Sequence, residues 1–125
     1  MAQGILDSNI IIYSIQLNQS ALRNYLANYS LYASQISKVE VLGYHLITAQ
    51  DKLDLEILFQ NLSILDVSNN IIQKAIDLKQ SQKMTLGDSL IAATSIVYQI
   101  PLLTRNTEDF KNISTLTIIN PFDFI

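Results

Sequence analysis

Cysteine is absent from the 125 residues of this chain, which also contains a single histidine. Without cysteine there is no disulfide bond and no thiolate zinc site, and a reducing cytoplasm is allowed. No apolar run approaches the roughly 20 residues that span a bilayer. The first residues, MAQGILDSNIIIYS, lack the basic segment and the cleavage site of a secretory signal. We therefore expect a soluble, cytoplasmic protein without a membrane partner.

Positive charge is also scarce. Eight lysines and arginines stand against eleven aspartates and glutamates, which gives a formal net charge of −3. Affinity for nucleic acid grows with the number of phosphates that basic side chains neutralise. This composition therefore argues against an extended electrostatic interface with nucleic acid. If the substrate is nucleic acid, something other than these side chains must supply positive charge.

The chain contains no linker, repeat or low-complexity run, and 49% of its residues are hydrophobic, so residues 1–125 are expected to form one domain. Short apolar segments predict strands over residues 4–8, 31–37, 63–67, 100–106 and 116–121. Helical spacing predicts helices over residues 8–15, 20–29, 38–48, 51–62, 68–83 and 85–99. This alternation predicts an α/β fold, with a parallel sheet of about five strands flanked by helices on both faces.

Acidic residues recur near the ends of these strands. Asp7 lies at the carboxyl end of the first strand, whereas Glu40 and Asp88 lie early in two helices. Glu108 and Asp109 follow the fourth strand. Ligands of parallel sheets bind beyond the carboxyl ends of the strands, at a switch point in the strand order. These acids are therefore predicted to converge on one site.

For each acid considered alone, helix capping is the alternative to a role in a ligand site. The tetrads SKVE, ending at Glu40, and TLGD, ending at Asp88, fit the capping box. Asp7 can likewise cap the helix that follows it. However, Glu40 shares a helical face with Tyr44 and Ile47, and Asp88 shares one with apolar residues further along its helix. Both faces are predicted to point inward, and three independent caps explain this pattern poorly.

Clustered carboxylates repel one another, and burial favours their protonation unless a cation is present. Oxygen ligands without histidine or cysteine suit Mg²⁺ or Mn²⁺ rather than zinc. Such an ion also supplies the positive charge that the composition lacks, and it can activate water and orient a phosphodiester. The sequence therefore predicts a magnesium or manganese site that contains Asp7.

Four segments, LDSNIIIY, ISKVEVLGY, TLGDSLIAATSI and LLTRNTEDF, resemble the PIN domain in their order, spacing and predicted setting. They are particularly similar to VapC-type toxin ribonucleases of bacterial toxin and antitoxin pairs, and the resemblance covers essentially the whole chain. It implies an acidic metal site at Asp7, Glu40 and Asp88, and hydrolysis of RNA with Mg²⁺ or Mn²⁺. It also implies a homodimer and a small antitoxin protein as partner.

The fourth acidic position departs from the family pattern. Many members carry an aspartate where this chain has Asn106, and we take Asp109 rather than Glu108 as the acid that completes the site. Asn106 can serve as a neutral ligand, and Thr104 can hydrogen-bond a metal-bound water or a phosphate. Arg105 lies between them and can steer phosphates. Because Asn106 stands at this position, the sequence is compatible with a site for one metal ion or for two.

Two further features have functional and structural interpretations. Lys38, Lys83 and Lys111 neighbour the acidic motifs, where they either steer phosphates or act as ordinary surface charge. The apolar residues of 10–13 and 20–32 exceed what one small sheet needs, which favours a groove for an amphipathic antitoxin helix. Packing in the core or at an interface is the alternative for the tyrosines of this region.

Other classes with a similar sheet fit less well. A phospho-acceptor receiver domain needs an acidic pair at the first strand and a lysine near the fifth, and both are missing. A haloacid-dehalogenase-like phosphatase needs a second aspartate where this chain has Asn9. A catalytically silent PIN-like binding module stays open as the alternative to a nuclease, and weak Mn²⁺ binding without cleavage would identify it.

Overall fold

The computed structural model describes all 125 residues and contains one five-stranded parallel sheet. The strand order is β3-β2-β1-β4-β5, so β1 lies at the centre. The strands are β1 (Ala2–Leu6), β2 (Tyr29–Ser34), β3 (Ser63–Leu65), β4 (Leu102–Leu103) and β5 (Ile118–Ile119). The predicted α/β fold with a parallel sheet is confirmed. All five strands occur where they are predicted, although β4 and β5 are only two residues long.

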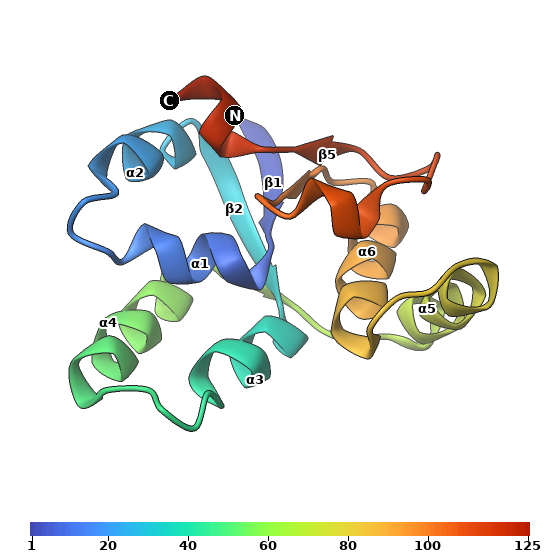
Figure 1. Ribbon diagram of the computed structural model, residues 1–125, viewed down its shortest axis with the longest axis horizontal. Helices are drawn as coiled ribbons and strands as arrows, with labels where there is room; N and C mark the ends of the chain where they lie inside the picture. Colours follow the sequence, from blue (N-terminus) through green and yellow to red (C-terminus); the bar gives the residue numbers. More distant parts are fainter.

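Helices cover both faces of this sheet. Figure 1 shows α1 to α4 on one side of the central strands and α5 and α6 on the other. The helices are α1 (Ser8–Ser14), α2 (Ser20–Leu26), α3 (Gln35–Leu42), α4 (Ala49–Gln60), α5 (Asn69–Ser81) and α6 (Leu86–Tyr98), with 3-10 turns η1 (Thr107–Phe110) and η2 (Pro121–Phe124). None of the helices has the length and apolarity needed to cross a membrane.

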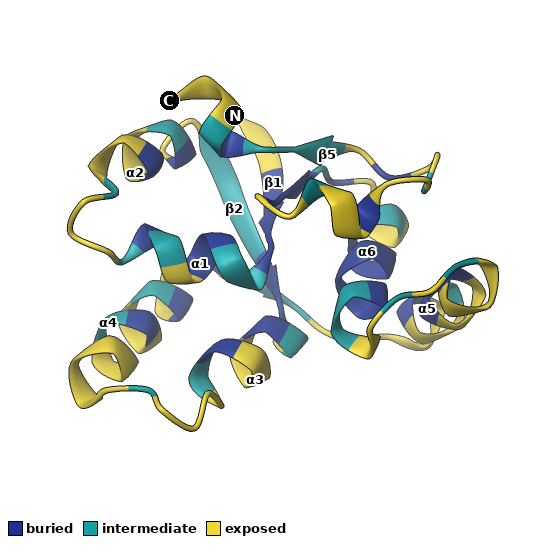
Figure 2. Ribbon diagram, viewed as in Figure 1, coloured by how far each residue is buried: buried dark blue, intermediate teal, exposed yellow.

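The central strands feed two separate hydrophobic cores. Successive side chains of a strand point to opposite faces, so Ile5 and Leu102 pack with α5 and α6, whereas Leu6 and Leu103 pack with the helices of the other layer. These four side chains are essentially inaccessible to solvent. Figure 2 shows the buried residues in the centre, between two layers of half-exposed helices. The carboxyl ends of β1 and β4 are therefore held rigidly from both sides.

Two predictions around Glu40 are wrong. The helix begins one turn earlier than predicted, because Ser34 is its N-cap and accepts a hydrogen bond from the Ile36 amide at 3.1 Å. Ser37 thus lies inside α3 and is not part of a capping box. The helix also ends at Leu42 instead of continuing to residue 48, so Tyr44 lies outside it and is exposed. Glu40 does not share a core-facing stripe with Tyr44.

The second predicted cap is confirmed. Thr85 is the N-cap of α6, and its hydroxyl accepts a hydrogen bond from the Asp88 amide at 3.1 Å. The remainder of the face that follows Asp88 is buried, as the apolar spacing predicts. Asp88 therefore lies where the core-facing side of α6 reaches the carboxyl edge of the sheet.

Candidate active site

Asp7 lies at the switch point of the sheet. The chain runs outward from β1 through β2 to β3 and then returns to the other side of β1 as β4, so ligands are expected where β1 and β4 end. Asp7 directly follows β1, and its amide donates to the Leu103 carbonyl at 2.9 Å. Thr104 directly follows β4. The two residues thus meet at the crevice although 97 positions separate them in sequence.

Three donors fix the Asp7 carboxylate. The Thr104 hydroxyl donates to Oδ2 at 2.6 Å, and the Asn9 side-chain amide donates to the same oxygen at 3.2 Å. The Ser8 amide donates to Oδ1 at 2.8 Å, so Asp7 is also the N-cap of α1. The structural and functional interpretations of Asp7 therefore coexist, because the cap holds the side chain at the crevice.

Burial raises the pKa of Asp7 to about 6. The hydrogen bonds from Thr104 and Ser8 oppose this shift, whereas the charges of Asp88 and Glu40 add to it. Only 5% of the residue is exposed. No cationic side chain pairs with it, since the only ion pair in the protein joins Lys111 to Glu108. The buried carboxylate therefore lacks a compensating charge.

Glu40 projects from α3 toward the same crevice. Its Oε1 accepts a hydrogen bond from the Ser8 hydroxyl at 2.8 Å, and Ser8 in turn lies 3.1 Å from the hydroxyl of Ser37. Its other oxygen lies against the first turn of α6: a Cβ atom built on Gly87 would approach Oε2 closely. Ser8 and Gly87 thus position Glu40 between α1 and α6.

Asp88 faces this group from the first turn of α6. Burial is the largest cause of its raised pKa, and the charge of Asp109 is the next. Hydrogen bonding by Thr85 lowers the pKa, whereas the charge of Glu40 raises it. The charges of Asp88 and Glu40 therefore act on Asp7, and those of Asp109 and Glu40 act on Asp88.

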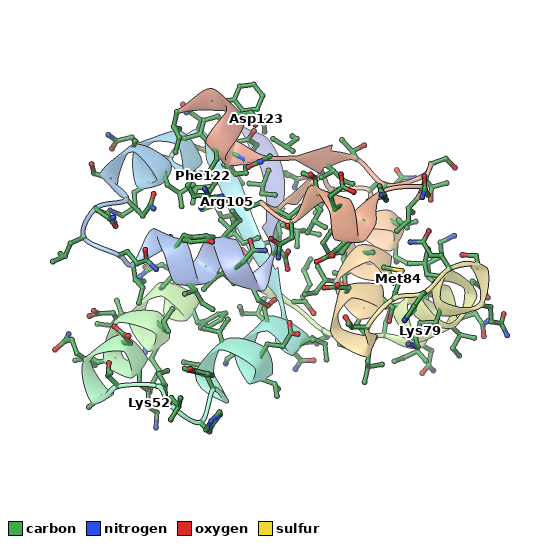
Figure 3. All side chains as sticks on the ribbon, viewed as in Figure 1. Lys52, Lys79, Met84, Arg105, Phe122 and Asp123 are labelled. Atoms are coloured by element: carbon green, nitrogen blue, oxygen red, sulfur yellow. The ribbon has the colours of Figure 1, made fainter.

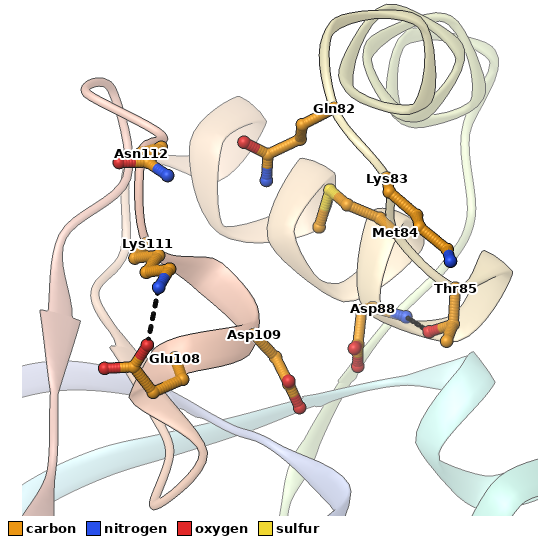
Figure 4. A pocket seen from close by; sticks show the side chains of 9 residues that line it. All are labelled: Gln82, Lys83, Met84, Thr85, Asp88, Glu108, Asp109, Lys111 and Asn112. Atoms are coloured by element: carbon orange, nitrogen blue, oxygen red, sulfur yellow. Dashed lines mark hydrogen bonds and ion pairs between the residues drawn. The ribbon is translucent and has the colours of Figure 1, made fainter.

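Glu108 and Asp109 are adjacent in η1 but have different surroundings. Glu108 forms an ion pair with Lys111 at 2.8 Å, which lowers the pKa of Glu108. In Figure 4 the Asp109 carboxylate extends toward the side of Asp88, whereas Glu108 points to Lys111. These surroundings favour Asp109 over Glu108 as the acid that faces the cluster.

The other predicted residues support the site from the β4 side. Thr104 uses its proton for Asp7 and accepts a hydrogen bond from the Asn106 amide at 3.1 Å, so it orients Asp7 rather than facing solvent. The Arg105 guanidinium lies 4.1 Å from the ring centre of Phe122 and 5.1 Å from that of Tyr13 (Figure 3). Arg105 therefore points toward η2 and α1.

The donor set is chemically suited to a hard divalent cation. All four acids offer oxygen, and their mutual repulsion is relieved by positive charge. In the present side-chain arrangement, however, no three of these acids are grouped tightly enough to hold one ion. Glu40 and Asp109 are exposed residues, and the Ser8 hydroxyl holds Glu40 in its present position.

Sequence reasoning did not identify the contacts that Ser8, Ser37 and Gly87 make around Glu40. Ser8 follows Asp7 directly, and Gly87 is one of only three glycines and precedes Asp88. The glycine inside a helical first turn is the available signal, because such a residue is often retained where another group approaches closely. The Ser8–Ser37 contact joins residues 29 positions apart and has no sequence signal.

Known proteins resemble this chain over most of its length. The family model of the PIN domain matches residues 4–116. The curated protein "Ribonuclease VapC" of Rickettsia bellii (strain RML369-C) is 45% identical over 51 residues, which are 39% of this chain and 38% of that protein. The similarity to this relative thus spans less than half of either sequence.

Two solved structures are similar over nearly the whole fold. VapBC2 from Rickettsia felis bound to a promoter DNA fragment has a TM-score of 0.80 at 25% identity, covering 94% of this chain and 97% of that one. A toxin-antitoxin complex from Klebsiella pneumoniae has a TM-score of 0.75 at 25% identity, covering 95% and 98%. With the family match over residues 4–116, these similarities show that the chain belongs to the PIN domain family.

Proposed function

We propose that residues 1–125 act as a cytoplasmic, metal-dependent endoribonuclease, the toxin of a toxin-antitoxin pair. The observation that carries the proposal is the Thr104–Asp7 hydrogen bond at the switch point, which holds a buried carboxylate near the charges of Asp88 and Glu40. The similarity to a protein named Ribonuclease VapC supports RNA as the substrate.

In this proposal Asp7, Glu40, Asp88 and Asp109 hold Mg²⁺ or Mn²⁺. Such an ion, when held by these residues, would supply positive charge for activating a water and for the charge that develops on the phosphate. Thr104 and the Ser8 amide keep both Asp7 oxygens in place, and the Ser8 hydroxyl does the same for Glu40. Asn106 steadies Thr104 through its backbone amide and offers a neutral side chain.

The proposed reaction uses water as the nucleophile, so no protein side chain forms a covalent bond with RNA. In-line attack of water on the phosphate would then leave a 5′-phosphate and a 3′-hydroxyl at the cut. The ends of the products are therefore a direct readout of the proposed chemistry.

An antitoxin protein is the proposed partner. The two solved structures include a VapBC assembly and a toxin-antitoxin complex, which supports this inference. A largely apolar cavity of about 530 Å³ lies between α1, α2, β2 and α4, and Leu17, Leu26 and Ile57 are among its lining residues. Residues of the predicted segment 20–32 line this cavity, whereas none of 10–13 does, because Ile10 and Ile11 are buried in the core. An amphipathic helix of the antitoxin fits such a groove.

We further propose that the protein is a homodimer. Val39 and Leu86 expose 71% and 66% of their surface on α3 and α6, beside Glu40 and Gly87, and Leu46 exposes 65%. A second copy of the chain would cover these side chains. Analytical ultracentrifugation of the purified chain measures its oligomeric state directly. A monomer at all concentrations would contradict this part of the proposal.

The nuclease is tested with purified protein, total RNA, and Mn²⁺ or Mg²⁺. We expect cleavage that is lost with chelator and with Asp7→Asn. Asp77→Asn changes an exposed acid on α5 in the same way and serves as the matched control, which should cleave normally. End-group analysis of the products then tests the role of water.

A catalytically silent binding module is the alternative function. Calorimetry with Mn²⁺ separates the two functions. Absence of both Mn²⁺ binding and RNA cleavage would establish the silent module, whereas Mn²⁺ binding that depends on Asp7 supports the nuclease.

A further inference from the structure

A polar cavity of about 440 Å³ opens beside the acidic cluster. One wall is the linker between α5 and α6, and the other is η1 with the residues that follow it (Figure 4). Asp88 and Asp109 belong to the lining, so the cavity is continuous with the candidate active site. Its volume lies in the range of pockets that hold small ligands.

Each wall of this cavity carries one lysine. Lys83 lies on the α5–α6 linker, and Lys111 lies just after η1. Lys83 forms no ion pair, and Lys111 pairs only with Glu108 in a contact whose side chains are 63% and 82% exposed. Such an exposed pair is weak and can be exchanged for another anion.

The same walls also carry neutral groups. Gln82 and Asn112 contribute side-chain amides, and Met84 contributes a thioether. Amides can donate to and accept from the edges of an unpaired base, whereas a thioether offers a polarizable apolar contact. Two cations, two amides and an apolar group match the phosphate and base of one nucleotide.

We propose that this cavity binds the nucleotide next to the scissile bond of a single-stranded RNA, with Lys83 and Lys111 contacting its phosphate. The inference rests on the proposed nuclease function and adds the path of the substrate to it. The two lysines are the cationic side chains of a lining that also contains the carboxylates of Asp88, Glu108 and Asp109. Glu108 acts as the internal anion that RNA phosphate replaces on Lys111.

The test measures binding separately from cleavage. A fluorescently labelled single-stranded RNA of mixed sequence is titrated with the full chain carrying Asp7→Asn, in chelator, over a series of salt concentrations. Lys83→Ala and Lys111→Ala are each expected to weaken binding several-fold at low salt. Each should also reduce the slope of log affinity against log salt by about 0.7, the value for one phosphate contact on a single strand.

Lys52→Ala is the matched control, because Lys52 is an exposed lysine on α4, away from this cavity (Figure 3). It should leave affinity and slope unchanged. Glu108→Gln should instead strengthen RNA binding, because it releases Lys111 and removes a negative charge. A purely structural role of the ion pair would weaken folding in both Lys111→Ala and Glu108→Gln, and thermal unfolding would reveal that.

The outcomes distinguish this inference from the nuclease itself. If the parent protein binds RNA and the two lysine variants behave like Lys52→Ala, the cavity assignment is wrong and the nuclease stands. If the parent neither binds nor cleaves RNA, both proposals fail. If the lysine variants lose affinity for an acidic antitoxin peptide but not for RNA, the cavity belongs to a protein interface, which also overturns the assignment.

Discussion

At the scale of single residues, Asp7 sets the chemistry of the site. A carboxylate that is 5% exposed and has no cationic partner is unfavourable in the folded chain, and its pKa of about 6 reflects this. The hydrogen bonds from Thr104 and Ser8 reduce the penalty without removing it. A bound divalent cation would compensate the buried charge of Asp7. Metal binding should therefore increase the free energy of unfolding.

Asp7→Asn should stabilise the metal-free protein near neutral pH. The folded pKa is about 6 against a usual value of 3.8, so the folded state binds the proton more tightly than the unfolded state. The contribution of Asp7 to stability is therefore greatest below its unfolded pKa of 3.8 and is lost as pH rises through 6, by about 3 kcal/mol in total. Asparagine carries no charge and escapes this loss. Denaturant unfolding in chelator at pH 4 and pH 7.5 measures both variants.

The comparison between the two pH values is the control for this prediction. At pH 4 the advantage of Asp7→Asn should nearly vanish, because Asp7 is mostly protonated in the folded protein. Saturating Mn²⁺ at pH 7.5 should stabilise the parent and not the variant. A variant that is less stable than the parent at pH 7.5 in chelator would contradict the prediction.

Thr104→Val should weaken Mn²⁺ binding. It removes the 2.6 Å hydrogen bond to Asp7, and a hydrogen bond to a charged group contributes about 1.5–3 kcal/mol. The pKa of Asp7 should rise further, because Thr104 opposes the effect of burial. Calorimetric titration at pH 7 should show lower affinity for Thr104→Val and near-normal affinity for Thr104→Ser. Equal loss in both variants would argue against a role for the hydroxyl.

At the scale of secondary-structure elements, Gly87 leaves room for the Glu40 carboxylate between α3 and α6. A Cβ atom at this position would collide with the Glu40 carboxylate, which is the end of a flexible side chain rather than backbone. The collision is therefore relieved by moving Glu40, and the helices themselves do not need to separate. The glycine thus bears on the site more than on the fold.

Gly87→Ala should lower Mn²⁺ affinity and RNA cleavage while leaving stability unchanged or slightly raised. Alanine favours helix by up to about 1 kcal/mol over glycine, whereas the displaced Glu40 loses its position between Ser8 and α6. Cleavage assays and thermal unfolding measured together check this. Val97→Ala, at the other end of α6 and exposed, is the control. A large loss of stability in Gly87→Ala would show that the fold, not Glu40, requires the glycine.

Arg105 joins three elements through its flat guanidinium. The group lies over Phe122 of η2 and near Tyr13 of α1, and those two rings meet edge to face with centroids 5.4 Å apart. Arg105→Lys should therefore lower the melting temperature, because an exposed cation–π contact contributes about 0.5–1 kcal/mol and lysine does not stack. Lys38→Ala removes an exposed charge on α3 and should leave the melting temperature unchanged. Equal melting temperatures for the parent and Arg105→Lys would disprove the contact's contribution.

At the scale of the whole molecule, the sheet separates two kinds of surface. The polar cavity beside Asp88 lies on the side of α5 and α6, whereas the apolar cavity lies among α1, α2 and α4. Substrate and protein partner are therefore proposed to contact different parts of the fold. Changes at one surface should leave binding at the other intact.

Ile57→Glu should abolish antitoxin binding without loss of folding or RNA cleavage. Ile57 lines the apolar cavity and is 49% exposed, so a charge there remains solvated in the free protein and is buried only in the complex. Size-exclusion chromatography with the product of a neighbouring short reading frame tests this. Ile76→Glu on α5 is the matched control, with 44% exposure. Equal binding by Ile57→Glu and the parent would locate the partner elsewhere.

The local sequence pattern predicted the presence of helices and strands better than the residues at which they begin and end. Short apolar segments identified all five strands, and the tetrad TLGD identified the α6 cap at Thr85. The local pattern failed after Leu42, because the apolar residues of 43–48 continue the helical spacing although the chain there forms a loop. It also failed at Ser37, whose hydroxyl meets Ser8 across the fold while Ser34 caps the helix.

The sequence by itself determined the parallel α/β fold, the family resemblance and the candidate acids, because these depend on residue type, order and spacing along the chain. Only the tertiary structure decided how the acids are held. The Thr104–Asp7 bond, the contact of Gly87 with Glu40 and the pairing of Glu108 with Lys111 depend on where side chains lie in space. Burial acts in the same way: the pKa of Asp7 is raised chiefly because two cores exclude water around the ends of β1 and β4.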